Sequence, residues 1–248
     1  MISIKSEREI ELLKVAGNIV YQTHQYLKQY LKPGITTKEL DKLAEDFIRS
    51  KGATPSFKGY EGFPATICTS INEQVVHGIP GNTKLKKGDV ISVDIGACYK
   101  GYHGDSAWTY QIGEVSKKVE DLMKYTKESL YEGIRQVKPG NRIGDISNAI
   151  EECAKKHNLG IVKELVGHGV GTSVHEDPDV PNYGTKNTGH VLKKGMVIAI
   201  EPMLTLGSPN IVILDDDWTI ETVDYSPAAH YEHTVVVTES GYKILTGE

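Results

Sequence analysis

Apolar residues recur at helical spacing along the first fifty positions of the chain. Residues 5–31 carry an apolar face that predicts an amphipathic helix, and Pro33-Gly34 ends it. The apolar positions of that face are Ile10, Leu13, Val20 and Leu27. Thr36 or Thr37 can cap a second helix, which Gly52 closes. Its apolar stripe consists of Leu40, Leu43, Ala44, Phe47 and Ile48.

The pattern changes from helical to alternating in the middle of the chain. Residues 53–63 are rich in glycine and aromatic residues, and we expect an irregular loop there. Residues 90–97 and 102–112 flank a turn at Tyr99-Lys100-Gly101, which predicts a β-hairpin over 90–112. Helices are expected at 116–136 and 143–157, and further strands at 65–70, 197–205, 210–214, 218–224, 231–238 and 242–246.

The sequence repeats itself at a nearly constant offset. Residues 86–94, KKGDVISVD, match residues 193–201, KKGMVIAIE, at an offset of 107, and each copy ends on a carboxylate. Lys-Pro-Gly at 32–34 returns at 138–140, an offset of 106. Coincidence would require all four features to share one offset by chance. We therefore expect an α/β fold of the α+β kind, with an internally duplicated, pseudo-twofold antiparallel sheet flanked by helices. Residues 1–248 would form a single domain of two fused repeats, roughly 1–112 and 113–248.

Composition and charge exclude several classes of function. The chain is 39% apolar and 25% charged, and its net charge of −5 without a basic run argues against binding nucleic acid. Its apolar runs are too short to span a membrane, and its charged first ten residues do not resemble a signal peptide. Three scattered cysteines, Cys68, Cys98 and Cys153, fit a reducing compartment better than a disulfide framework. We expect a cytoplasmic protein.

Acidic residues occur where the pattern predicts buried strands. Asp94 and Asp105 lie on opposite sides of the hairpin turn, so both can project from one sheet face. Glu201 ends the matching strand of the second repeat and Glu232 opens the next one. His168 lies between flexible glycines, which leave its imidazole unobstructed. Four carboxylates would repel one another without cations. With one histidine they suit two divalent ions, Mn²⁺, Fe²⁺ or Co²⁺, and Zn²⁺ is also acceptable.

The remaining histidines are less distinctive. His77 precedes a Gly-Ile-Pro turn and His175 follows His168 by seven residues, but a single histidine is more often a surface or core residue. His103 shares the strand face of Asp105 and stays open as a further ligand. We expect ordinary structural roles for His24, His157 and His190.

Several short motifs follow one another along the chain. They are SINE at 70–73, HGIP at 77–80, VDIG at 93–96, GDS at 104–106, GHGVG at 167–171, HE at 175–176, IEPM at 200–203 and YEHT at 231–234. In this order they resemble type I methionine aminopeptidases, and the likeness covers almost the whole chain. Thirty residues separate Glu201 from Glu232, too few for the large insert of type II relatives, and no N-terminal zinc-finger extension is expected. The resemblance is to the short bacterial form and implies the pita-bread fold.

The resemblance also implies a role for each matching residue. Asp105 and Glu232 would bridge two metal ions, Asp94 would hold one ion, and His168 with Glu201 would hold the other. His77 and His175 would contact the substrate and, with Glu201, carry the catalysis. The methionine pocket would draw on Tyr60, Phe63, Cys68, His77 and Trp218.

The activity implied is the metal-dependent removal of N-terminal methionine from nascent proteins and peptides that have a small second residue, by metal-activated attack of water on the first peptide bond. Nascent N-termini would be the partners, association with the ribosome is compatible with that substrate, and a monomer is expected. Three alternatives stay open: a prolidase or aminopeptidase P, a metal-free binding protein of the same fold, and a creatine-type hydrolase. All five expected ligands are present, which opposes the last two.

Overall fold

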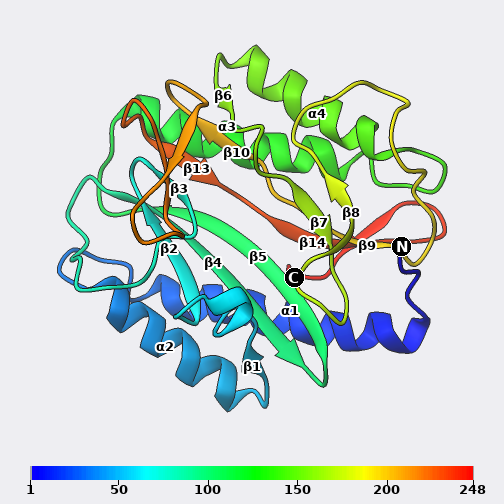
Figure 1. Ribbon diagram of the computed structural model, residues 1–248, viewed down its shortest axis with the longest axis horizontal. Helices are drawn as coiled ribbons and strands as arrows, with labels where there is room; N and C mark the ends of the chain where they lie inside the picture. The colour runs from blue at the N-terminus through cyan, green and yellow to red at the C-terminus, as the bar shows by residue number, and fades with distance from the viewer. Residues whose placement is uncertain (1, 248) are drawn as a thin grey trace.

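The computed structural model describes residues 2–247 and shows strands enclosed between two pairs of helices (Figure 1). The pair α1 (Glu7–Lys28) and α2 (Thr37–Ser50) lies on one side of the long central strands, and the pair α3 (Lys117–Ile134) and α4 (Ile143–Lys156) lies on the other. The sequence predicts all of these helices to within a few residues. Within residues 2–247, every helix is too short or too polar to cross a membrane.

The first two helices begin at residues that satisfy their free backbone N–H groups. Ser6 and Glu9 form a capping box at the start of α1, and Thr36 and Glu39 form one at the start of α2. Thr36, rather than Thr37, is therefore the cap of the second helix.

The same backbone contacts recur in both halves of the chain. The Gly34 N–H donates to the Leu85 carbonyl over 2.8 Å, and the Gly140 N–H donates to the Leu192 carbonyl over 3.1 Å. Isolated bridges repeat at the same offsets, between Thr36 and Lys84 and between Arg142 and Val191. The duplication predicted from the sequence is confirmed in the backbone.

The predicted hairpin is formed by β4 (Val90–Tyr99) and β5 (Tyr102–Gln111), which pair along their full length. Lys100 and Gly101 make the two-residue turn, with φ angles of 50° and 83°, as tight hairpins require. On its other edge β4 pairs with two shorter strands, β1 (Thr54–Pro55) and β2 (Ile67–Ile71). Between β1 and β2 the expected irregular loop contains one 3₁₀ turn, Tyr60–Gly62.

Shorter strands build the second half. They are β6 (Gly160–Ile161), β7 (Gly167–Gly169), β8 (Glu176–Val180), β9 (Val197–Ile200), β10 (Met203–Thr205), β11 (Ile211–Ile213), β12 (Ile220–Thr222), β13 (Ala228–His230), β14 (His233–Val237) and β15 (Tyr242–Ile244). The pairing orders are β15-β14-β9-β7-β8, β13-β10-β6 and β11-β12-β3, with β3 (Gln74–Val76) supplied by the first half. The sequence analysis does not predict β1, β3, β6, β7, β8 or β13.

Two predictions about strands in the second half are wrong. The prediction of one strand over 197–205 is wrong, because Pro202 lacks an N–H and the chain passes there from β9 to β10 in another sheet. The prediction that Glu232 opens a strand is also wrong, because Tyr231 and Glu232 lie between β13 and β14, where the chain crosses back. Glu201 and Glu232 therefore both lie at crossings between the same two sheets.

Two separate apolar cores lie beneath the helix pairs. Under α1 and α2 the core includes Leu27, Leu40, Ile48, Ile91 and Ile95. Under α3 and α4 it includes Leu130, Ile146, Ile150, Ile198 and Leu204. Each helix pair thus holds its own set of strands, and the acidic residues named above lie where the two sets meet.

Candidate metal centre

Asp94 and Asp105 are diagonal neighbours on one face of the hairpin. The register pairs Asp94 with Ala107 and Asp105 with Gly96, so the two carboxylates are offset by two positions on the same side. Burial raises the pKa of Asp94 to about 7. Burial, with the charges of Asp94 and Glu201, raises the pKa of Asp105 well above its usual value. The predicted placement of both acids on one sheet face is confirmed.

Hydrogen bonds between the two halves hold Glu232 beside Asp105. The Glu232 N–H donates to the Ala107 carbonyl over 2.8 Å, and the Ser106 hydroxyl donates to the Glu232 carbonyl over 2.7 Å. The Thr234 hydroxyl donates to the Asp105 carbonyl, also over 2.7 Å. Asp105 and Glu232 are 3% and 2% exposed, so two acids from opposite halves are buried together.

His168 completes the cluster from the short strand β7. Its Nε2 lies 3.4 Å from Glu201 Oε1 and 3.9 Å from Asp105 Oδ2. Donor atoms of Asp105, His168 and Glu232 all lie within 4.8 Å of one another. The Nδ1 contacts the Gly169 carbonyl at 2.9 Å and, as an N–H, would donate to it, which leaves Nε2 as the free lone pair. Burial lowers the pKa of His168 to about 3, so the imidazole is neutral and able to bind a metal.

Glycines on both sides of His168 allow the close approach of two neighbouring strands. A side chain at Gly167 would meet the Ala199 carbonyl oxygen at 2.4 Å, and one at Gly169 would meet the Asp177 carbonyl oxygen at 2.2 Å. Glycine at these positions therefore fixes the depth at which the imidazole enters the cluster.

The donor set fits divalent cations. Within residues 2–247, Asp94 Oδ1, Asp105 Oδ1 and Glu232 Oε1 are buried oxygens without a hydrogen-bond partner. Burial raises the pKa of Glu201 to about 8, and burial with three neighbouring acids raises that of Glu232 well above its usual value. Such acids are stable as anions only beside positive charge. Oxygen-rich sites with one imidazole suit Mn²⁺, Fe²⁺ and Co²⁺, and they also accept Zn²⁺.

His230 is a site residue that the sequence reasoning missed. It ends β13, is 2% exposed and places Nε2 at 3.4 Å from Glu201 Oε2. Burial lowers its pKa to about 4, and within residues 2–247 its Nε2 has no hydrogen-bond partner. One feature of the sequence could have identified His230. It lies two residues before Glu232, and alternate residues of an extended chain share one side. His103, by contrast, lies outside the cavity wall and shares a hydrogen bond of 2.9 Å with Ser56 Oγ.

A cavity of about 290 Å³ opens onto the cluster. The predicted metal ligands and the predicted pocket residues all line it: Asp94, Asp105, His168, Glu201, Glu232, Tyr60, Phe63, Cys68, His77, His175 and Trp218. Phe57 and His230 line it as well. The Phe63 and Trp218 rings meet edge to face with centroids 5.1 Å apart. Burial raises the pKa of Cys68 well above its usual value, so its thiol stays neutral and belongs to the apolar wall.

Two histidines stand between the apolar wall and the acids. His175 Nδ1 lies 3.0 Å from the Tyr60 hydroxyl, and its ring centroid lies 4.1 Å from that of His168. His77 adopts the left-handed backbone region, with φ of 60°, and its ring meets Trp218 edge to face. Burial lowers the pKa of both histidines, that of His77 to about 4. Both rings are therefore neutral near pH 7 and can each donate one N–H.

An apolar pocket that leads to buried carboxylates and neutral histidines is the arrangement expected of a metal-dependent hydrolase. The sequence model of metallopeptidase family M24 matches residues 11–239. The chain belongs to metallopeptidase family M24 and, within it, to the methionine aminopeptidases.

Its relatives share both the sequence and the fold. Methionine aminopeptidase 1 of Bacillus subtilis is 53% identical over 246 residues, which cover 99% of each chain. The crystal structure of methionine aminopeptidase from Thermotoga maritima superposes with a TM-score of 0.98 at 44% identity and covers 100% of both chains. The prolidase of Pyrococcus furiosus shares the pita-bread fold, with a TM-score of 0.80 at 25% identity, but this chain covers only 65% of it.

Proposed function

We propose that this protein removes the N-terminal methionine from peptides and nascent proteins, with a preference for a small second residue. The observation that carries the proposal is the apolar cavity that opens directly onto the acid and histidine cluster. Relatives that match the full length of the chain and are named methionine aminopeptidases support it. The two repeats would act as one catalytic unit, because the cluster draws ligands from both.

Two divalent ions would be held by the five predicted ligands. Asp105 and Glu232, fastened together across the two halves, would bridge both ions. Asp94 would hold one ion, and His168 with Glu201 would hold the other. Such ions, when bound, acidify a water molecule and polarise the carbonyl that it attacks. The donor chemistry admits Mn²⁺, Fe²⁺, Co²⁺ or Zn²⁺.

The surrounding side chains would orient the peptide and move protons. The Tyr60 hydroxyl would donate to His175 Nδ1, so that the Nε2–H of His175 points to the oxygen that becomes negative during attack. His77 would hold the scissile amide in position. Glu201 would accept the proton of the attacking water and return it to the departing amine. The free amino group of the substrate would lie beside the acids, which restricts cleavage to the first residue.

The cavity wall would select methionine. Phe63, Cys68 and Trp218 offer apolar and aromatic surfaces to an unbranched thioether, and sulfur makes favourable contacts with aromatic rings. The cavity of about 290 Å³ is near the lower end of the range for small-molecule pockets. A methionine side chain fits a cavity of this size.

Nascent chains emerge in the cytoplasm, and the proposal places the protein there as a monomer that meets their N-termini. Association with the ribosome and the absence of nucleic-acid binding belong to this proposal as well.

A comparison of peptides tests the proposal. Met-Ala-Ser is expected to be cleaved rapidly in the presence of Mn²⁺ or Co²⁺, Met-Ile-Ser slowly, and a dipeptide of the Xaa-Pro type not at all. Free peptides have no fold that could hide the end, so the difference reports on the second-residue subsite. Equal rates for Met-Ala-Ser and Met-Ile-Ser would contradict the narrow subsite. Preferential cleavage of Xaa-Pro would replace the proposal with the prolidase alternative.

A further inference from the structure

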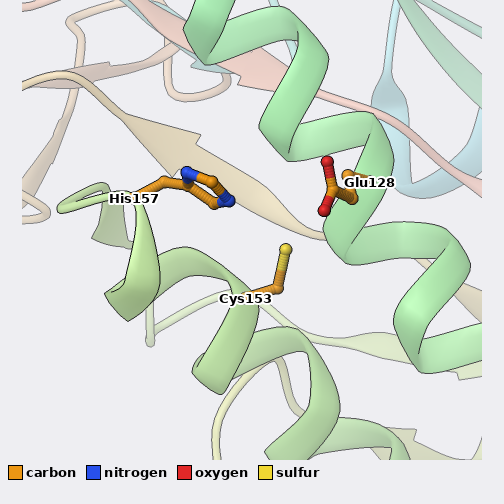
Figure 2. Close-up of side chains that lie close together, drawn as sticks. All are labelled: Glu128, Cys153 and His157. Carbon is orange, nitrogen blue, oxygen red and sulfur yellow. The ribbon is translucent and has the colours of Figure 1, made fainter.

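A second group of metal-ligand side chains lies between α3 and α4, outside the cavity described above. Glu128 projects from α3 and Cys153 from α4, and His157 is the residue that caps the C-terminal end of α4 (Figure 2). One donor atom from each residue lies within 4.8 Å of the donor atoms of the other two. Figure 2 shows the thiol, the carboxylate and the imidazole around one space between the two helices.

Each of the three donors is without a competing partner. Cys153 and His157 are four positions apart, a spacing that puts both on one face of a helix. Within residues 2–247, the buried Nε2 of His157 has no hydrogen-bond partner, and the side chain of Glu128 makes no hydrogen bond or ion pair. The His157 ring is stacked on Tyr125, with centroids 3.4 Å apart and an interplanar angle of 10°, which holds its orientation.

We infer that Glu128, Cys153 and His157 form a second binding site for a divalent transition-metal ion, zinc in the first place, that links α3 to α4. Thiolate, imidazole and carboxylate are the ligands of tetrahedral zinc, at about 2.0–2.3 Å from the metal. Ligands at those distances lie roughly 3.5 Å from one another. The present donor atoms lie within 4.8 Å of one another, so a closure of about 1 Å brings them to that spacing.

The site opens to solvent on one side. When Cys153 binds a metal, its thiol gives its proton to the solvent. A polar cleft of about 490 Å³ connects the site to solvent, and its lining includes Cys153, the acids Glu128, Glu132, Asp145 and Glu152, and the lysines Lys138, Lys156 and Lys186. It admits the ion and leaves room for water as the fourth ligand.

The first half of the chain has different chemistry at the equivalent place. The residues 106 positions earlier are Gln22, Phe47 and Lys51. Phe47 stacks on Tyr26 at 4.5 Å, and the Lys51 ammonium lies over the Phe47 ring at 4.9 Å. Aromatic side chains thus pack between α1 and α2, whereas the side chains of the three proposed metal ligands lie between α3 and α4. Under the duplication, a bound ion takes the place of this aromatic contact.

Metal content measured on the full-length protein tests the inference. After equilibrium dialysis against Zn²⁺, the wild type is expected to hold one more ion per chain than Cys153→Ser. The matched control is Cys98→Ser, a free cysteine on the hairpin strand β4, which should keep the wild-type content. With Co²⁺, the wild type and Cys98→Ser should show the near-ultraviolet absorption of a cobalt–thiolate bond, and Cys153→Ser should lose it.

A second variant covers the case in which Cys153→Ser folds poorly. Glu128→Gln changes a partly exposed side chain, and it should weaken Zn²⁺ binding at this site at least about tenfold while circular dichroism stays unchanged. Peptidase activity should stay at the wild-type level in Glu128→Gln, because Glu128 lies outside the active-site cavity. Equal Zn²⁺ content and equal cobalt spectra in the wild type and Cys153→Ser would overturn the inference. So would an unchanged Zn²⁺ affinity in Glu128→Gln.

Discussion

The two halves of the molecule bring carboxylates to the centre in different ways. Asp94 and Asp105 are carried by the continuous strands β4 and β5, each ten residues long. Glu201 and Glu232 lie where the chain leaves one sheet for another, next to strands of three to five residues. The register of the hairpin places the first pair side by side. The second pair is placed by contacts such as the bond from Ser106 to the Glu232 carbonyl, so it depends on the first half.

The difference also appears in the side chains. The regular hairpin uses the shorter aspartates, whose position follows from the backbone. The crossings use glutamates, and around them the second half adds two histidines, His168 and His230, within 3.4 Å of the Glu201 carboxylate. The backbone is duplicated, but the centre is asymmetric. The first half supplies two aspartates on regular strands, and the second half supplies two glutamates and two histidines.

Matched substitutions in the two halves should produce the largest effect. Asp105→Asn and Glu232→Gln remove one negative charge each with little change of shape. Both should lower kcat/KM by more than the roughly 10²–10³-fold that loss of one transition-state donor typically costs. Both should also lower metal content, measured by dialysis and metal analysis, with circular dichroism unchanged. Wild-type turnover with full metal content in either variant would show that this half does not supply a ligand.

Replacement of a histidine that contacts substrate separates catalysis from metal binding. His175→Ala removes the N–H assigned to the developing oxyanion, and turnover should fall by about 10²–10³. Metal content should stay at the wild-type level. Tyr60→Phe, which removes only the hydroxyl beside His175, serves as the graded control and should give a smaller loss. Loss of metal from His175→Ala would move this residue into the ligand set.

His230 tests whether the second half adds more than the expected ligands. His230→Gln keeps a polar side chain of similar size beside Glu201 but removes the imidazole. Activity or metal affinity should fall by about 10–100-fold, as is usual when a partner of a metal ligand is lost. His24→Gln is the matched control, a buried histidine that bonds to Tyr110 and the Ser106 carbonyl outside the cavity. An effect in His24→Gln as large as in His230→Gln would point to general destabilisation.

The smallest expected effect is a pH dependence of stability in the metal-free protein. Burial raises the pKa of Asp94 from 3.8 to about 7 and that of Glu201 from 4.5 to about 8. Burial also lowers the pKa of histidines such as His77 and His168, and these residues make the free energy of unfolding rise with pH up to about 6.5, the pKa of an unfolded histidine. Above that pH the acids dominate, because the folded state still holds protons on them that the unfolded state has lost, so the free energy of unfolding falls as the pH rises from about 7 to about 8. With a chelator present, Tm should be about 2 °C or more lower at pH 8 than at pH 7.

Two additions sharpen the thermal experiment. Excess Mn²⁺ should remove the loss at pH 8, because the metal binds the ionised acids of the folded state. Asp105→Asn should flatten the pH dependence without metal, since one of the repelling charges is gone. A Tm that rises between pH 7 and pH 8 in the presence of the chelator would contradict the raised pKa values of these acids.

Much of the fold could be predicted because it follows local patterns. The helices show apolar spacing and caps, and the hairpin shows alternation around a Lys-Gly turn. In the second half, the predictions of β11, β12, β14 and β15 are confirmed to within a few residues. The strands β6, β7, β8 and β13 could not be predicted, because two to five residues are too few for a period to appear. The crossing at Glu201 had one local signal, Pro202, and the crossing at Glu232 had none.

The residues of the candidate site also differ in whether local patterns could predict their placement. The positions of Asp94 and Asp105 on one face follow from the hairpin, and the duplication relates them to Glu201 and Glu232. The joint placement of Tyr60, Cys68 and Trp218 rested on the resemblance alone, since nothing local brings such distant segments together. His230 was missed because its approach to Glu201 depends on how β13 pairs with β10, a contact between distant parts of the chain.

The hydrogen bonds between Asp105 and Thr234 also set when the centre can form during synthesis. They join residues 129 positions apart, and their second partner lies in β14. Because the ribosome makes the chain from its N-terminus, the hairpin must wait, with its acids in water, for a segment that is synthesised 129 residues later. The centre therefore cannot assemble before β14 has been made, and a product that stops before β14 is not expected to be a partly active peptidase.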